Sequence, residues 1–188
     1  MKRRNFCRLA FVLVLISFLW GCGSSMMINT KPMAIPENND AIVTFIRPTM
    51  FGGAIKFGLW DSENFIGILT AKSYVQYKTH PGEHLFIARA ENWSYVKANL
   101  NPGKQYLILG KVYPGVWKAR VGLDPVNKND NISQAQIDNW LNGLRPTTVI
   151  PAKVDAYAKP RIPQIKTAIE KFKAGEVKYH ELKAEDYR

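Results

Sequence analysis

Cysteine is almost absent from this chain of 188 residues, which contains only Cys7 and Cys22. Two cysteines cannot form the dense disulfide framework of a small secreted scaffold. Acidic residues are also scarce, with 15 Asp and Glu against 26 Lys and Arg and a net charge of +11. The longest largely apolar run, residues 9–20, would span about 18 Å as a helix, whereas the hydrocarbon core of a bilayer is roughly 30 Å thick. We therefore expect neither a disulfide scaffold nor a permanent transmembrane helix.

Signatures of catalysis are missing too. The chain has no G-x-S-x-G motif and no Gly-rich phosphate loop before a helix. The segment HPGEH at residues 80–84 holds two imidazoles and a carboxylate, but a zinc site needs three or four converging ligands. Because Pro81 and Gly82 force a turn between His80 and His84, we expect solvated hairpin residues there and no metal site.

Asp61 and Glu63 are a candidate carboxylate pair for glycoside cleavage, which uses two carboxyl groups flanking the scissile bond. Both lie on a predicted hairpin turn, so we expect exposed turn acids. The sequence thus predicts no catalytic residue and no cofactor, and it favours a non-enzymatic protein. A buried cleft with paired carboxylates or a His–Asp contact would instead favour a hydrolase.

The N-terminus has the layout of a secretory signal, in which basic residues precede the apolar run 9–20. The basic residues are Lys2, Arg3, Arg4 and Arg8. No A-x-A-like cleavage site follows, but Gly21 and Cys22 close the apolar stretch, and this segment resembles the bacterial lipobox. The resemblance implies cleavage before Cys22, a diacylglycerol thioether on its thiol and acylation of the new N-terminus, typically with palmitate. Several acyl chains together give stable anchoring. The alternative is an ordinary signal peptide with an incidental cysteine.

Gly23 follows the cysteine, and the lack of an Asp at this position favours the outer membrane, with the protein facing the periplasm. Removal of residues 1–21 takes away four basic residues and no acid, which lowers the net charge to +7. An exported protein of this charge is expected to meet anionic lipid or glycan surfaces rather than nucleic acid.

Residues 22–40 are rich in small and polar residues and predict a lipidated tether. Residues 41–124 then contain eight short runs of β-branched and aromatic residues, each ended by turn residues. The runs are 41–47, 54–61, 64–70, 73–79, 84–90, 93–100, 105–113 and 116–123. This pattern predicts a mainly β fold, an antiparallel β-sandwich of about seven to eight strands.

Residues 125–188 predict a helical extension of two helices packed on the sandwich. Ser133 and Gln136 have the spacing of a capping box before a helix that ends near Gly143. A second helix is expected from about Pro163 to the C-cap Gly175. The segment between them is expected to be extended or irregular.

The stretch from Asp61 to Leu109 carries the segments FIGIL (65–69), PGEH (81–84) and NPGKQY (101–106). It resembles a family of bacterial envelope lipoproteins with a domain of unknown function, and it is similar to PEGA-like β-sandwich domains. The resemblance implies a small β-sandwich in the cell envelope with no established activity, and it assigns no catalytic residue.

Basic and aromatic residues are interleaved along the predicted strands. The candidate surface-binding residues are Trp60, Trp93, Lys97, Lys118 and Arg120. Two readings follow from them: a structural or protein-interaction module of the envelope, or a periplasmic module that binds glycan or peptidoglycan through exposed aromatic rings. A third reading is an envelope hydrolase with a site between the sandwich and the helices. The simplest alternative is that the lysines are the solvated side of two-sided strands.

Overall fold

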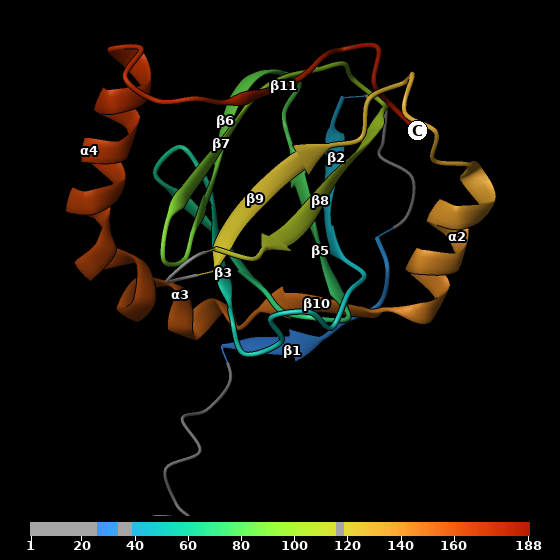
Figure 1. Cartoon of the computed structure of the whole chain (residues 1–188), viewed down its shortest axis with the longest axis horizontal. Helices are drawn as coiled ribbons and strands as arrows, with labels where there is room; N and C mark the ends of the chain where they lie inside the picture. The colour runs from blue at the N-terminus through green and yellow to red at the C-terminus, as the bar shows by residue number, and fades with distance from the viewer. Residues whose placement is uncertain (1–25, 34–38, 116–118) are drawn as a thin grey trace, which may run out of the picture.

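The structure is a computed structural model that describes residues 26–33, 39–115 and 119–188. This described part contains eleven strands in two sheets and three α-helices, so the predicted mainly β fold is confirmed (Figure 1). The predicted signal peptide with Gly21 and Cys22, as well as Lys118, lies outside the described residues.

The six-stranded sheet has the order β1-β10-β5-β2-β8-β9, and the five-stranded sheet has the order β11-β7-β6-β3-β4. The first sheet consists of β1 (Met27–Asn29), β10 (Arg145–Val149), β5 (Ser73–Thr79), β2 (Ala41–Arg47), β8 (Gln105–Tyr113) and β9 (Arg120–Pro125). The second consists of β11 (His180–Leu182), β7 (Trp93–Leu100), β6 (Gly82–Arg89), β3 (Phe57–Asp61) and β4 (Asn64–Leu69). The helices are α2 (Gln134–Gly143), α3 (Pro151–Ala158) and α4 (Ile162–Lys173), and the 3-10 helix η2 (Lys159–Arg161) joins the last two.

The two sheets bury one common apolar core. Phe45 and Ile108 of the six-stranded sheet belong to the same buried cluster as Phe57 and Phe86 of the five-stranded sheet. The rings of Phe45 and Phe86 meet edge to face, with centroids 5.4 Å apart. Such aromatic pairs contribute beyond the area that they bury. The burial of alternate residues on facing sheets is what specifies the strand register.

The strand prediction was wrong in number and in direction. Three of the eleven strands, β1, β10 and β11, are three to five residues long and are not among the eight predicted runs. β1 lies in the segment expected to be a tether, and β10 in the segment expected to be extended or irregular. β11 lies in the C-terminal tail, where a short strand and a frayed helix were both open alternatives. Three pairs are parallel, namely β2 with β8, β10 with β5 and β11 with β7. Short strands show no readable alternation, and a hydrophobic pattern does not report the order in which strands pair.

The expected domain boundaries are also not those of the structure. Met27–Asn29, inside the segment expected to be a tether, pairs with β10. The C-terminal segment 125–188 contributes β10 to one sheet and β11 to the other. The segments 41–124 and 125–188 therefore form their sheets jointly.

α2 and α4 cover the outer faces of the two sheets and lie on opposite sides of the molecule in Figure 1. Ser133 is the N-cap of α2, and its hydroxyl oxygen accepts a hydrogen bond from the backbone N–H of Gln136 at 3.2 Å, as predicted. α2 packs Ile137 against Tyr74 and Leu107 of the six-stranded sheet. On the other side, the apolar face of α4 packs on the five-stranded sheet. The helices expected near 134–144 and from 163 are confirmed. The segment expected to be extended or irregular is extended in β10, but it also forms the helix α3, which was not predicted.

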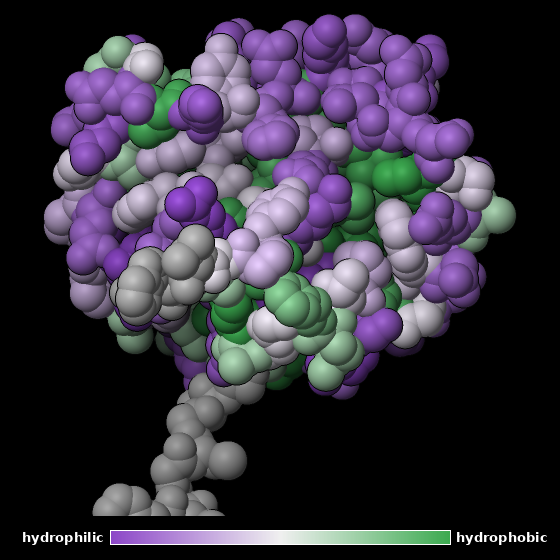
Figure 2. Space-filling model, viewed as in Figure 1, coloured by the Kyte–Doolittle hydropathy of each residue, from purple (hydrophilic) through white to green (hydrophobic). Residues whose placement is uncertain are grey.

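Across the described residues, no helix has the length and apolarity needed to span a bilayer. The upper end of the molecule in Figure 2 is mostly hydrophilic, whereas hydrophobic residues gather at the lower end, near β1.

Candidate functional site

An open groove of about 740 Å³ lies between α4 and the outer face of the five-stranded sheet, beside the turn that joins β6 to β7. This volume lies within the range of small-molecule sites. Its lining includes Arg89, Trp93, Tyr95, Gln164, Lys171 and Lys178. The groove therefore combines aromatic rings with basic side chains.

The side chains of Asn92, in the β6–β7 turn, and of Ser94, near the start of β7, hold this end of the sheet in place. The Asn92 side chain donates a hydrogen bond to the carbonyl of Val121 at 2.9 Å and accepts one from its N–H at 2.7 Å. The hydroxyl of Ser94 accepts a bond from the N–H of Leu123 at 2.9 Å. These side chains replace a strand partner between β7 and β9 and satisfy backbone groups at the sheet edge. Trp93 lies between them, so its backbone position is fixed.

The aromatic residues of the groove are held by their neighbours. Trp93 is half-buried, and the guanidinium of Arg89, its cross-strand partner, lies 5.5 Å from the centre of its ring. Such a cation–π contact orients both side chains. The ring of Tyr95 is stacked on Phe172 of α4, with centroids 6.2 Å apart. Tyr95 is buried under this contact, so the half-buried Trp93, oriented by Arg89, is the ring that offers an apolar face to a ligand at low entropic cost.

The charge of the groove is basic. Three cations, Arg89, Lys171 and Lys178, face one acid, Glu91. Within the described part of the chain, none of these three cations has a carboxylate partner within ion-pair distance. Unpaired cations around a concave surface attract anions, because the low-dielectric wall concentrates their field. The groove is therefore suited to an anionic ligand.

The structure brings only one of the predicted surface-binding residues, Trp93, into this groove. Trp60 is 1% exposed and lies beneath α4, so its prediction as a surface residue is wrong. Lys97 is exposed on β7 but belongs to a separate hollow near β11. Arg120 is exposed on β9, outside the groove.

Sequence reasoning missed Arg89, Lys171 and Lys178. Arg89 could have been predicted from the sequence. It ends the strand before the turn that leads to Trp93, so the two residues are cross-strand partners, and such partners contact each other. Lys171 on α4 and Lys178 in the segment after α4 could not be predicted in this way, since the sequence pattern there does not indicate which sheet these side chains border.

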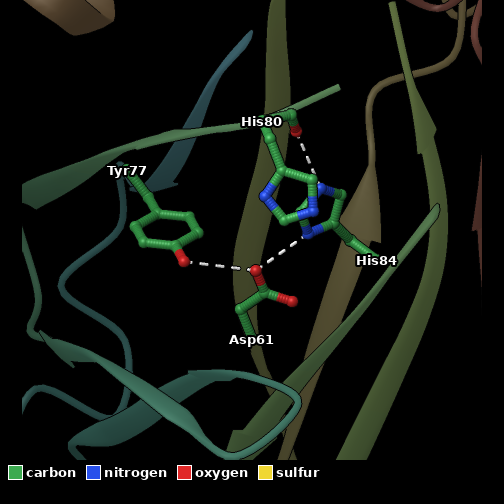
Figure 3. Close-up of polar contacts among 4 residues, drawn as sticks. All are labelled: Asp61, Tyr77, His80 and His84. Atoms are coloured by element: carbon green, nitrogen blue, oxygen red, sulfur yellow. Dashed lines mark hydrogen bonds and ion pairs between the residues drawn. The ribbon is translucent and has the colours of Figure 1, made fainter. Parts of the chain in front are cut away.

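A second polar cluster lies between the sheets (Figure 3). Asp61 is 5% exposed and His84 is 6% exposed, so the expectation of solvated turn residues was wrong for these two, whereas His80 and Glu63 are exposed as expected. The Nδ1 atom of His84 donates to Oδ2 of Asp61 at 2.8 Å, and the hydroxyl of Tyr77 donates to the same oxygen at 3.2 Å. The Nε2 atom of His84 donates to the carbonyl of His80 at 2.9 Å. The cluster links β5 of one sheet to β3 and β6 of the other.

The electrostatics of this cluster follow from its acceptors. Burial lowers the pKa of His84, but the hydrogen bond and charge of Asp61, together with the carbonyl of His80, outweigh it and raise the pKa above the ordinary 6.5. A carboxylate and a carbonyl can only accept hydrogen bonds, so this arrangement favours the imidazolium form of His84, in which both ring nitrogens donate. Burial and the nearby Asp61 likewise raise the pKa of the Tyr77 hydroxyl.

A His–Asp contact would favour a hydrolase only if the other ring nitrogen were free to act on a nucleophile. In this structure Nε2 of His84 is taken by the carbonyl of His80. Glu63, the other acid of the candidate carboxylate pair, is exposed and lies 3.6 Å from Lys166, so it does not converge with Asp61. In the segments that the structure describes, no three His, Cys, Asp or Glu side chains are placed to hold a metal ion. The geometry makes this cluster a structural link between the sheets.

Comparison with known proteins gives no match: no protein-family model fits the chain, and no curated protein or solved structure is significantly similar to it.

Proposed function

We propose that this protein is a lipid-anchored, non-enzymatic binding module of the bacterial cell envelope, and that its β-sandwich holds an anionic glycan in the groove beside α4. One observation carries the proposal: a half-buried tryptophan shares a single open groove with three cations that have no carboxylate partner among the residues that the structure describes. The same observation favours a glycan-binding module over a purely structural protein.

The chemistry of the groove fits such a ligand. The apolar face of a sugar ring packs against an aromatic side chain such as Trp93, as apolar surfaces of this kind do. Carboxylates of peptidoglycan or phosphates of lipopolysaccharide would accept hydrogen bonds from Arg89 and the two lysines, and charge-assisted bonds are the strong ones. The opening of the groove to solvent leaves room for a polymer to continue beyond it.

The anchor is the second half of the proposal. It rests on the basic residues, the apolar run and Gly21-Cys22 at the N-terminus. Acyl chains on Cys22 would hold the protein on the outer membrane, facing the periplasm, where the glycan layer is within reach.

Binding to purified peptidoglycan sacculi tests the groove. We expect the mature lipoprotein in detergent to sediment with sacculi, less strongly as salt is raised, because exposed charges are screened. The variant Lys171→Ala/Lys178→Ala should lose most of this binding. The control Lys166→Ala/Lys173→Ala removes the same charge from exposed sites on α4 outside the groove and should keep it.

Equal binding by the two variants would show that the groove is not the site. Recovery of one dominant protein from envelope extract, with no retention on sacculi, would instead establish a protein-interaction module.

A further inference from the structure

The loop at residues 48–56, between β2 and β3, exposes two large apolar side chains. Met50 is 62% exposed and Phe51 is 57% exposed, which makes them the most exposed large hydrophobic side chains in the described part of the protein. Beside them lies a hollow of about 340 Å³ with an almost entirely apolar lining that includes Phe51, Val112 and Trp140. Adjacent exposed apolar groups of this kind mark an interaction surface.

The buried guanidinium of Arg47 holds the loop in this conformation. Arg47 is 0% exposed, and its Nη2 atom donates to the carbonyls of Phe51 at 2.9 Å and Gly52 at 2.7 Å. Its Nη1 atom donates to the carbonyl of Ile55, and its guanidinium lies 5.0 Å from the ring centre of Phe57. A buried guanidinium is costly unless its donors are used. Here Nη1 and Nη2 are used by three carbonyls of the loop, which fixes the loop backbone next to the exposed Met50 and Phe51.

This loop lies at the end of the molecule where β1 begins. Ser73, the first residue of β5, pairs with Arg47 at the end of β2 and with Arg145 at the start of β10. β10 in turn pairs with β1, whose Ile28 is 48% exposed. Figure 1 shows the loop and β1 at the same lower end, and Figure 2 shows hydrophobic residues there.

Cys22 precedes Met26 by only four residues, a span of at most about 14 Å when fully extended. An acylated Cys22 would therefore hold this end of the domain next to the bilayer. Lys31, after β1, and Lys56, at the end of the loop, are both exposed. Cations beside an apolar protrusion are what an anionic lipid surface attracts.

We propose that Met50 and Phe51 insert into the bilayer that carries the acylated Cys22, so that the domain docks on the membrane through this loop in one orientation. The proposal rests on the lipid anchor proposed above. The partner of this loop is the lipid interface, because the acylated N-terminus of the same chain would hold this end of the domain next to the bilayer.

A spin label on the loop tests this directly. Maturation removes Cys7 and acylates Cys22, so Met50→Cys supplies the one free thiol of the mature chain. The matched control is Asn129→Cys in the exposed segment between β9 and α2, at the opposite end of the molecule in Figure 1. Each labelled lipoprotein is reconstituted in vesicles of phosphatidylethanolamine and phosphatidylglycerol. Its accessibility to dissolved oxygen and to a water-soluble nickel complex is then measured.

We expect the label at residue 50 to lose accessibility to the nickel complex and gain accessibility to oxygen when vesicles are added, while the control label does not change. Adding Phe51→Asp to the labelled Met50→Cys chain should return the label to water. A label at residue 50 that stays in water while the protein remains on the vesicles would overturn the docking proposal and leave the anchor intact. A protein that does not stay on the vesicles would overturn both.

Discussion

The Nδ1 atom of His84 lies 2.8 Å from Oδ2 of Asp61, and both side chains are more than nine-tenths buried between the two sheets. The pair is a cation and an anion enclosed in an otherwise apolar core, with the ring of Phe86 stacked 5.5 Å from the imidazole. Buried ion pairs are costly to form and more costly to break. This pair should therefore govern how the domain responds to pH and to substitution.

The first prediction concerns pH. The pKa of His84 is raised in the folded state above 6.5, so the folded protein binds this proton more tightly than the unfolded chain. The resulting stabilisation is fully present below pH 6.5 and is lost as the pH rises through the folded-state pKa. We expect the melting temperature to fall from mildly acidic to alkaline pH by more than in His84→Gln. Parallel circular dichroism melts of the two proteins measure the difference, and equal slopes would contradict the prediction.

The second prediction concerns the carboxylate. Asp61→Leu removes the acceptor of both His84 and Tyr77, so the free energy of unfolding should fall by about 3–5 kcal/mol. The double variant Asp61→Leu/His84→Phe replaces both charged partners by apolar groups and should recover part of this loss. Denaturant unfolding measures both values. A double variant less stable than Asp61→Leu alone would show that His84 contributes independently of Asp61.

The outline of the fold was readable where strands were long and bounded by turn residues. The bounds of β2, β5, β7 and β8 match the runs 41–47, 73–79, 93–100 and 105–113. α3 was missed although Pro151 at its first turn is a start signal, since Pro is favoured there. The parallel pairing of β2 with β8 had no local signal, because five strands separate them in sequence.

The site was harder to predict because β3 and most of β6, in the middle of the five-stranded sheet, are buried on both faces. Phe57, Leu59 and Asp61 alternate on the inner face of β3, and Trp60 lies on the outer face under α4. The prediction of Trp60 as a surface residue requires a solvated outer face, but α4 covers this part of it. The apolar run at 84–90 indicates a strand that is covered on both sides, since such strands lose the alternation of polar and apolar residues.

The third prediction separates the two tryptophans that the sequence could not distinguish. Trp60→Ala leaves a cavity beneath α4 and should lower the free energy of unfolding by about 3–5 kcal/mol. Trp93→Ala should cost less stability because Trp93 is half-buried, yet it should abolish most binding to sacculi. Denaturant unfolding and sedimentation with sacculi are measured on both variants. Undiminished binding by a folded Trp93→Ala would exclude this residue from the site.

The fourth prediction concerns the buried arginine under the apolar loop. Arg47→Met removes the donors to the carbonyls of the loop, and each hydrogen bond to a charged group is worth about 1.5–3 kcal/mol. The loop should open more often, so chymotrypsin under native conditions should cleave after Phe51 faster than in the parent protein. Arg145→Met, at an exposed site on β10, is the matched control and should be cleaved at the parent rate. Unchanged cleavage of Arg47→Met would show that other contacts hold the loop.

The fifth prediction concerns the anchor. Cys22→Ala removes the thiol that carries the lipid, and processing of a lipoprotein signal depends on that lipid. Cells expressing this variant should therefore accumulate a slower-migrating precursor that takes up no labelled palmitate. Cys7→Ala alters the other cysteine of the chain and should be labelled and processed as the parent protein is. Normal labelling of Cys22→Ala would contradict lipid attachment at Cys22. A parent protein that is processed but not labelled would instead establish an ordinary signal peptide. Either result leaves the groove beside α4 to be tested on its own, because its geometry does not depend on Cys22.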